Sequence, residues 1–402
     1  MAKDVINLAI VGCGGIAGAH LNGYENLIKA GYDRFRFAAV VDPYKANTEA
    51  FQLRIKEMTG EAPAAFACVE DMLKAKLPID GADVCTPHAL HHSSAIPCLN
   101  KGINVMVEKP CGITIKASHK ILAAAEKSGA FVATAEQVRR CKPARTMEWA
   151  INKKKMMGTP RFMTMQVFGY QEFDWKSYKF AWRGLKVLGG GGMLVDAGAH
   201  FTDMMLHVFG PVKEVTCDLR TFFQPTLDGP CGIGKAKLDV EDTWLAQLRF
   251  ESGFISDWGY CREARGHKTR TGVYYGSKAS LRDKQEWMHP FQFGADLIDN
   301  AGNELPYEEI EKQYMASLNQ KQMDKLFPYG LGDGMSNEVW DFVDAIDKGR
   351  QPEVTGYDGM QAKAVCYALY ESSLAGKWIS VEDVASGKVN AYQKPIDKFW
   401  KI

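Results

Sequence analysis

The first third of the chain alternates short, continuously apolar runs with longer amphipathic segments, and this alternation constrains the fold more than any other feature of the sequence. Apolar runs of this length predict strands buried on both faces, and helices between them predict parallel pairing. The predicted strands are residues 6–11, 37–41, 82–85, 104–107 and 131–133, and the predicted helices are residues 16–30, 45–58, 92–100 and 115–127. The pattern therefore predicts an α/β domain built on a doubly wound parallel sheet.

After about residue 135 the strands become longer and alternate in polarity, which is typical of antiparallel sheets. Strands are predicted at 160–169, 212–223 and 268–277, with a hairpin of 242–250 and 254–260, and helices at 192–209 and 336–348. The polar, glycine-interrupted residues 297–334 are predicted to be an insertion or a lid. A chain of 402 residues is two to three times a typical domain of about 150 residues. We therefore predict two domains, 1–134 and 135–402. The second is α+β with a large, mostly antiparallel open-faced sheet, and its late helices can pack back on the first domain.

The composition excludes several classes of partner. Lys plus Arg number 49 and Asp plus Glu number 48, so no global field attracts nucleic acid or anionic lipid. The ten cysteines are scattered without a C-x-x-C pair, which indicates reduced thiols. The apolar run at 6–11 is too short for a leader or a membrane span. We expect a cytoplasmic protein with no nucleic-acid or membrane partner.

A glycine pattern closes the first predicted strand and opens the first helix. The segment 12–17 reads GCGGIA, a G-x-G-x-x-A pattern. Glycine permits the tight turn and the close approach of a pyrophosphate, and the helix N-terminus faces the anion. The pattern predicts a Rossmann dinucleotide site lined by Gly12, Gly14, Gly15 and Ile16.

An acidic residue ends the next predicted strand, where such sites bind the adenosine ribose. Asp42 follows the apolar residues 37–41, and Pro43 and Tyr44 come after it in place of Ser or Arg. A carboxylate there accepts hydrogen bonds from ribose hydroxyls and repels a 2′-phosphate. The sequence therefore favours NAD over NADP.

Three residues have the chemistry that removal of a hydroxyl proton requires. Lys109 follows a predicted central strand, at the edge where open α/β sheets bind ligands, although a surface lysine is the plainer alternative. Asp196 and His200 stand at i and i+4 of one predicted helix, about 5–6 Å apart on one face. Adding Asp203 and His207 extends that face to about 16 Å, too long for one metal ion, so no metal site is predicted.

Three segments resemble the Gfo/Idh/MocA oxidoreductases, the family of glucose-fructose oxidoreductase and inositol dehydrogenase. They are residues 84–91 (VCTPHALH), 104–110 (NVMVEKP) and 190–203 (GGGMLVDAGAHFTD). The resemblance spans residue 6 to about residue 280. It implies that Lys109, Asp196 and His200 form the catalytic set.

The resemblance also implies further contacts to the cofactor. These are Thr86, Pro87, His88, His91, Glu108, Lys109, Trp182 and Arg183. His88 stands where relatives carry Asn, and Arg183 is either a phosphate contact or a surface residue. Six aromatic residues precede the glycine run, and they either stack on a sugar ring or pack in the core: Tyr170, Phe173, Trp175, Tyr178, Phe180 and Trp182.

The function implied by the resemblance is oxidation of a ring secondary hydroxyl of a sugar, glycoside or cyclitol by hydride transfer to NAD, with C3 of a glucose-like ring as a guess. Two alternatives remain open. One is a glycoside-cleaving enzyme that recycles its NAD through a keto intermediate, and the other is a non-catalytic NAD-binding regulator. Because an open sheet face is usually covered, a homo-oligomer is expected.

Overall fold

A computed structural model describes residues 5–228 and 232–402, so Cys231 lies outside the described residues. The chain forms two compact units, each made of two segments. Unit 1 comprises residues 5–137 and 323–360, and unit 2 comprises residues 138–322 and 361–402. The first domain was expected to be residues 1–134, whereas unit 1 also contains the late segment 323–360. None of the described helices has the length and hydropathy needed to span a bilayer.

Unit 1 is built on a six-stranded parallel sheet with the order β3-β2-β1-β4-β5-β6. Its strands are β1 (Ile6–Val11), β2 (Phe35–Val41), β3 (Ala64–Phe66), β4 (Gly81–Val84), β5 (Asn104–Glu108) and β6 (Val132–Ala135). The five predicted strands are confirmed to within a few residues. The short edge strand β3 was not predicted, because three residues give no periodicity to detect.

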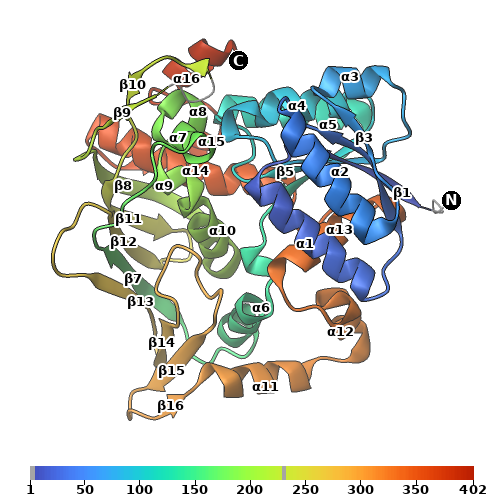
Figure 1. Cartoon of the computed structure of the whole chain (residues 1–402). Helices are drawn as coiled ribbons and strands as arrows, with labels where there is room; N and C mark the ends of the chain where they lie inside the picture. The colour runs from blue at the N-terminus through green and yellow to red at the C-terminus, as the bar shows by residue number, and fades with distance from the viewer. Residues whose placement is uncertain (1–4, 229–231) are drawn as a thin grey trace. The chain divides into compact units, whose positions relative to one another are not determined.

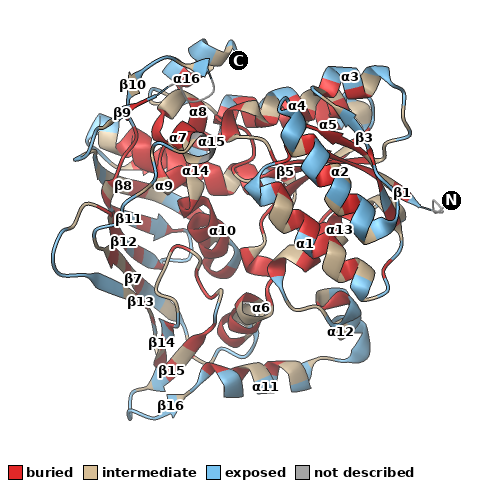
Figure 2. Cartoon of the chain, in the orientation of Figure 1, coloured by how far each residue is buried: buried red, intermediate tan, exposed pale blue. Residues whose placement is uncertain are grey.

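Helices cover both faces of this sheet (Figure 1). They are α1 (Gly15–Lys29), α2 (Lys45–Thr59), α3 (Val69–Lys74), α4 (His91–Leu99), α5 (Ile115–Ser128) and α13 (Gly334–Lys348). One apolar cluster lies under α1, α2 and α13, and a second lies under α3, α4 and α5. In Figure 2 the strands are buried while the helices present exposed outer faces. This is a doubly wound sheet.

Helix α13 reaches unit 1 from late in the sequence and packs against α1 (Figure 1). Gly23 of α1 makes this approach possible, because a Cβ there would lie 3.0 Å from the Met335 carbonyl oxygen. A hydrogen bond also joins the two helices, donated by the half-buried Asn26 to the buried Ser336 (3.1 Å). The contact between α1 and α13 brings the side chain of Glu338 into the core of unit 1.

Unit 2 contains a nine-stranded sheet with the order β16-β15-β14-β13-β7-β12-β11-β8-β17. The strands are β7 (Pro160–Phe168), β8 (Val212–Arg220), β11 (Thr243–Phe250), β12 (Ile255–Cys261), β13 (Thr269–Gly276), β14 (Ala279–Asp283), β15 (Ala295–Asp299), β16 (Glu304–Leu305) and β17 (Ile379–Ser380). Only β7 and β12 pair in parallel. The predicted hairpin of β11 and β12 is confirmed.

The two faces of this sheet differ in burial. On the inner face Trp258 is fully buried and stacks on Phe201 (ring centroids 4.0 Å apart). The helices of the unit are α6 (Lys142–Glu148), α7 (Tyr178–Ala181), α8 (Lys186–Gly189), α9 (Met193–Asp196), α10 (Gly198–Phe209), α11 (Tyr307–Ser317), α15 (Val381–Ala385) and α16 (Lys394–Trp400), together with most of α14 (Gly356–Ala375). Helix α12 (Gln320–Leu326) spans the division between the units. The outer face leaves apolar side chains such as Phe162 and Leu245 exposed.

Two expectations are corrected in unit 2. The single helix predicted at 192–209 is two helices, α9 and α10, joined at Ala197. There the His200 amide bonds the Ala197 carbonyl in a tighter turn (3.1 Å), and Gly198 passes so close to Trp258 that a Cβ would lie 2.9 Å from its ring.

The polar stretch 297–334 is also more regular than predicted. It begins in β15, which belongs to the main sheet, and continues through β16, α11 and α12. The glycine interruption is a turn between two strands, in which Asp299 accepts hydrogen bonds from the backbone of Ala301 and Asn303 (2.9 Å each). The predicted start at residue 297 thus lies inside the main sheet, which corrects this boundary, and the role of the stretch as an insertion or a lid stays a prediction.

Candidate cofactor and catalytic sites

The glycine loop between β1 and α1 lies directly against the end of β4. Gly12 has φ +92°, and a Cβ there would lie 2.9 Å from backbone atoms of Cys85 and Thr86. Gly14 and Gly15 have open space on their Cβ side and are exposed. Helix α1 begins at Gly15, so its first N–H groups are available to an anion. The loop has the form that a pyrophosphate requires.

Asp42 closes β2 beside this loop and is largely buried. Its Oδ2 accepts a hydrogen bond from the Cys13 amide (2.9 Å), and its Oδ1 accepts from the Tyr44 amide (2.8 Å) and from Asn47 (3.2 Å). A carboxylate has about four acceptor positions, so these bonds leave capacity for a hydroxyl donor. Asp42 thus fixes the glycine loop and retains an acceptor position.

The turn after β4 carries Thr86, Pro87 and His88. The Thr86 hydroxyl is buried and has no hydrogen-bond partner within the described residues. His88 is also buried, and its ring lies 5.6 Å from that of His91. His91 has no exposed surface, and its two ring nitrogens lie 2.8 Å from the Thr86 carbonyl and 2.9 Å from the Pro110 carbonyl. His91 therefore connects the turn after β4 with the turn after β5.

A buried cluster of ionisable side chains centred on His20 lies behind the same turns. The imidazole has no exposed surface, and its Nδ1 lies 2.9 Å from Asp83 Oδ2. Its Nε2 lies 3.0 Å from Glu108 and 3.4 Å from Glu338. Burial alone would lower the pKa of His20, but the Asp83 carboxylate, with Cys85 beside it, outweighs burial and raises that pKa well above its usual value. His20 is therefore an imidazolium shared among three carboxylates.

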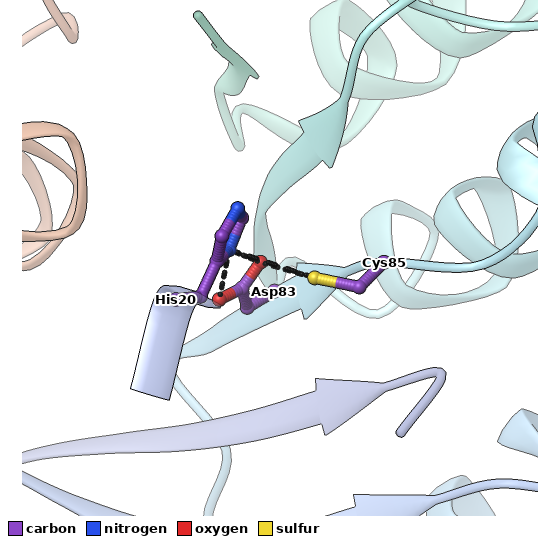
Figure 3. Close-up of side chains that lie close together, drawn as sticks. All are labelled: His20, Asp83 and Cys85. Atoms are coloured by element: carbon purple, nitrogen blue, oxygen red, sulfur yellow. Dashed lines mark hydrogen bonds and ion pairs between the residues drawn. The ribbon is translucent and has the colours of Figure 1, made fainter. Parts of the chain in front are cut away.

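The same cluster offers three types of side chain that bind metals, namely His20, Asp83 and Cys85 (Figure 3). Figure 3 shows the Asp83 carboxylate in contact with both the imidazole and the sulfur. The nitrogen–oxygen separation of 2.9 Å is that of a hydrogen bond. Burial raises the pKa of the Cys85 thiol well above its usual value, which disfavours the thiolate that a metal requires. A hydrogen-bonded ion cluster explains these three residues better than a metal site.

Lys109 follows β5 and is half-buried. Both of its neighbours are fixed, because Glu108 bonds His20 and the Pro110 carbonyl bonds His91. The backbone that carries the ammonium is therefore held on both sides. The expected cofactor contact Glu108 is itself only 4% exposed, so it acts on this turn from within the core.

In unit 2 the glycine run before α9 is held by one buried carboxylate. Glu241 Oε2 accepts a hydrogen bond from the Gly192 amide (2.9 Å), and Oε1 accepts from the Leu194 amide (2.8 Å). The Tyr370 hydroxyl also donates to Glu241 (2.7 Å). Burial raises the pKa of Glu241, and the hydrogen bonds from Leu194, Tyr370 and Gly192 oppose that shift. This node fixes the turn that leads to Asp196.

Asp196 and His200 lie on consecutive short helices. Arg183 Nε donates to Asp196 Oδ2 (2.8 Å), and the guanidinium lies over the Trp182 ring (4.3 Å). The structure thus places Arg183, an expected phosphate contact, against the expected catalytic carboxylate. His200 is 3% exposed, and its ring lies edge-on to that of His289 (4.7 Å).

Asp203 lies on the next turn of α10 and forms a buried ion pair with Arg139 (2.8 Å). Because both side chains are at most 10% exposed, this pair is part of the interior of unit 2. It anchors α10 to the segment that precedes α6. Asp203 therefore serves the helix that carries His200.

The aromatic residues before the glycine run pack on one another. Phe173, Trp175 and Phe180 lie 5.1–5.6 Å apart between ring centroids. They line a cavity of about 10 Å³ together with Asp196 and Arg262, room for about one water molecule. Of the two predicted roles, packing in the core and stacking on a sugar ring, these contacts correspond to packing. The Tyr178 side chain lies outside the described residues.

His20 and Glu241 were not identified from the sequence. His20 lies on the buried stripe of α1, where a lone histidine among apolar positions is the available signal. Glu241 precedes β11 beside Asp242, and an acidic pair at a strand end is common on protein surfaces. Their partners Glu338 and Tyr370 come from distant segments, which sequence spacing does not reveal.

Comparison with known proteins identifies the chain along most of its length. The model for the oxidoreductase family with an NAD-binding Rossmann fold matches residues 6–136, and the model for the GFO/IDH/MocA C-terminal domain matches residues 150–282. The 1,5-anhydro-D-fructose reductase of Ensifer adhaerens is 22% identical over 306 residues, 76% of this chain and 80% of the relative. The D-glucoside 3-dehydrogenase of Escherichia coli is 24% identical over 266 residues, 63% of this chain and 70% of the relative.

A solved structure shares the fold. The WlbA dehydrogenase from Chromobacterium violaceum, in complex with NADH and UDP-GlcNAcA, superposes with a TM-score of 0.72 at 22% identity, covering 94% of this chain and 97% of that one. Since the relatives are dehydrogenases and reductases, the non-catalytic alternative is set aside. The chain belongs to the GFO/IDH/MocA family and is an NAD-binding oxidoreductase.

Proposed function

We propose that the protein is an NAD-dependent dehydrogenase that oxidises a ring secondary hydroxyl of a sugar, glycoside or cyclitol. The observation that carries this proposal is the setting of Lys109. This half-buried residue follows a central strand, and both of its neighbours are hydrogen-bonded to buried histidines. A cation fixed at the ligand-binding edge of a parallel sheet is suited to orient a hydroxyl oxygen and to stabilise charge that develops on it.

Residues around the glycine loop fit the cofactor. A Cβ at Gly12 would fill the close approach, and the buried Thr86 hydroxyl has no partner within the described residues. Direct contacts are assigned to Gly12, Gly14, Gly15, Ile16, Asp42, Thr86, Pro87 and His88. The buried residues His91 and Glu108 are assigned to hold the turns. Asp42 disfavours a 2′-phosphate, so NAD is preferred over NADP.

The bound nicotinamide supplies the acceptor for the hydride that leaves the ring carbon. His200 takes the hydroxyl proton, because the neutral imidazole ring of a histidine is the commonest general base in enzymes. Lys109 donates a hydrogen bond to the reacting oxygen. Asp196 orients the substrate through a neighbouring hydroxyl, and Arg183 holds its carboxylate in place through their 2.8 Å contact.

The test is NADH absorbance with a panel of sugars, inositols and glycosides, using wild type, Lys109→Ala and His200→Ala. Each variant is expected to lose about a hundredfold or more in rate on the best substrate, which is the usual share of a general acid–base group. Wild-type rates in both variants contradict the assignment. Glycoside cleavage without net NADH identifies the redox-neutral alternative. A glycoside blocked at C3 tests whether C3 of a glucose-like ring is the carbon that is oxidised.

We further assign a homo-oligomer that uses the outer face of the nine-stranded sheet. Phe162 and Tyr275 stack on that face (4.6 Å) and remain 46% and 37% exposed, and Leu245 and Ile255 are 58% and 46% exposed. Apolar side chains gathered on an open sheet face are typical of an interface. Sedimentation of wild type and Leu245→Lys checks this, since the charged variant is expected to dissociate.

A further inference from the structure

A second cavity in unit 2, of about 200 Å³, differs from the aromatic one in its chemistry. It lies where β7 and β12 end and β13 begins, next to the 169–171 segment. Tyr260 and Arg270 belong to the same alternating positions as the buried Trp258 and Tyr274. They therefore project to the inner face of the sheet. Its volume is about 200 Å³ against about 10 Å³ for the aromatic cavity, so it accommodates a charged group and part of a sugar ring.

The lining of the cavity carries three cations and no acid. Its lining residues include Arg262, Lys268 and Arg270 and no Asp or Glu. Arg262 is paired with Glu263, just outside the cavity (2.9 Å). Lys268 and Arg270 form no ion pair with any residue in the described ranges. The lining thus carries an excess of positive charge.

Two lining residues each carry a buried polar atom that lacks a partner among the described residues. The atoms are Nη2 of Arg262, whose side chain is 3% exposed, and the Tyr260 hydroxyl, 1% exposed. A buried donor without a partner costs about 1–3 kcal/mol, and an ordered water or a bound anion can satisfy it. Both atoms are hydrogen-bond donors to an anion.

An aromatic wall completes the cavity. The Arg270 guanidinium lies over the Trp287 ring (5.0 Å), which fixes the otherwise flexible side chain. Trp287 also meets Tyr260 edge-on (6.2 Å). Arginine held on a ring presents its N–H fork in one direction, as recognition of a carboxylate or a phosphate requires.

Arg262 connects this cavity to the proposed catalytic residues. It lines both cavities, and the smaller one is also lined by Asp196 and Arg183. A group bound at Lys268 and Arg270 would therefore extend from a ring that lies near Asp196. A neutral sugar has no charged group to place beside Lys268 and Arg270.

We propose that this cavity binds the carboxylate or phosphate of an acidic sugar, so that the substrate of the proposed dehydrogenase is anionic. This inference rests on the proposed function for the identity of the ligand, but the binding it requires is measured without turnover. A carboxylate and a phosphate share the chemistry that the cavity recognises, and the experiment separates them.

The experiment measures the affinity of the NAD-loaded protein for D-glucuronate, D-glucose 6-phosphate and methyl α-D-glucoside by calorimetry, at one ionic strength set with KCl. The variant is Lys268→Gln combined with Arg270→Gln. The matched control is Arg249→Gln, because Arg249 lies on β11 of the same sheet and also stacks on a tryptophan (Trp378, 3.9 Å) but does not line the cavity.

Wild type is expected to bind at least one acidic sugar about tenfold or more tightly than the neutral glycoside, as charge-assisted hydrogen bonds would give. The double variant is expected to lose this preference, and the control to keep it. Equal affinity for acidic and neutral sugars, no measurable binding of the acidic sugars, or a preference that survives in the double variant overturns the proposal. Failure of every sugar to yield NADH, with the binding preference intact, contradicts only the proposed function.

Discussion

The two units hold their proposed chemical groups in opposite ways. In unit 1, one buried imidazole lies among carboxylates from three other elements, and one of them, Glu108, precedes Lys109. In unit 2, one buried carboxylate, Glu241, lies among N–H and O–H donors, two of which precede Asp196. The first arrangement depends on charge, and the second depends on hydrogen bonds to neutral groups. Similar positioning is thus achieved by two kinds of polar core, which are expected to fail in different ways.

The largest effect is expected from His20→Leu. It leaves Asp83, Glu108 and Glu338 buried without a cation, and breaking a buried ion cluster costs about 3–5 kcal/mol. Urea unfolding measures the loss. His119→Ala, an exposed histidine of α5 in the same unit, serves as the control and is expected to change the free energy of unfolding by less than about 0.5 kcal/mol. If His20→Leu lowers the free energy of unfolding no more than the control does, the charge cluster does not stabilise unit 1.

Glu241→Gln is expected to have a smaller effect on stability, about 1–3 kcal/mol, because its partners are neutral. The amide keeps one acceptor oxygen and loses the other, so the bonds from Gly192 and Tyr370 are weakened. Tyr370→Phe removes one donor and is expected to cost about 1 kcal/mol. Unfolding of both variants checks the order, and a larger loss in Tyr370→Phe than in Glu241→Gln contradicts it.

Gly12→Ala tests the cofactor side without touching either buried charge. The added methyl group would lie 2.9 Å from backbone atoms of Cys85 and Thr86, so the glycine loop has to move away from the end of β4. Gly31→Ala is the matched control, because Gly31 has nearly the same φ as Gly12 (+90° against +92°) but open space on its Cβ side. Its loss of stability therefore measures the backbone strain alone. Both variants are expected to lose about 1–2 kcal/mol of stability from that strain. NAD affinity is expected to fall about tenfold or more only in Gly12→Ala, and equal affinities contradict the assigned close approach.

The smallest effect is a difference in pH dependence. The pKa of His20 is raised from 6.5, so its contribution to the free energy of unfolding is complete below pH 6.5 and is lost as pH rises through the raised value. The pKa of Glu241 is raised from 4.5, so its contribution is lost over a window that begins near pH 4.5. Cys85 and Tyr24, which face His20, titrate only from 9.0 and 10.0 upward.

Urea unfolding over a pH series separates the two windows. His20→Leu is expected to flatten the decline in stability that begins near pH 6.5, and Glu241→Gln is expected to flatten the decline that begins near pH 4.5. If the two variants flatten the same window, the difference drawn between the units is wrong.

The parts of the fold that the sequence predicts are those encoded over short distances. Gly12 and Asp42 were identified because a turn and a strand end are local features, and the hairpin of β11 and β12 follows from its alternation and its turn. His20 and Glu241 escaped because a buried polar side chain is defined by its partners. Those partners, Glu338 and Tyr370, belong to α13 and α14.

The same reasoning explains the two structural corrections. The division of helix 192–209 at Ala197 lies beside the packing of Gly198 on Trp258, a contact between distant segments that sequence spacing does not reveal. The turn after Asp299 was local and was available in the sequence, but its glycine was attributed to an insertion.

The most direct measurement of the central claim is transfer of deuterium from a ring-deuterated sugar to NAD, detected by mass spectrometry of the NADH formed. Wild type is expected to yield deuterated NADH. The Lys109→Met variant keeps the length of the side chain and removes its charge, and it is expected to lose the transfer by about a hundredfold or more while NAD affinity stays within about threefold. NADH that carries no deuterium from any ring position, or a Lys109→Met variant that transfers deuterium at the wild-type rate, would contradict the central claim.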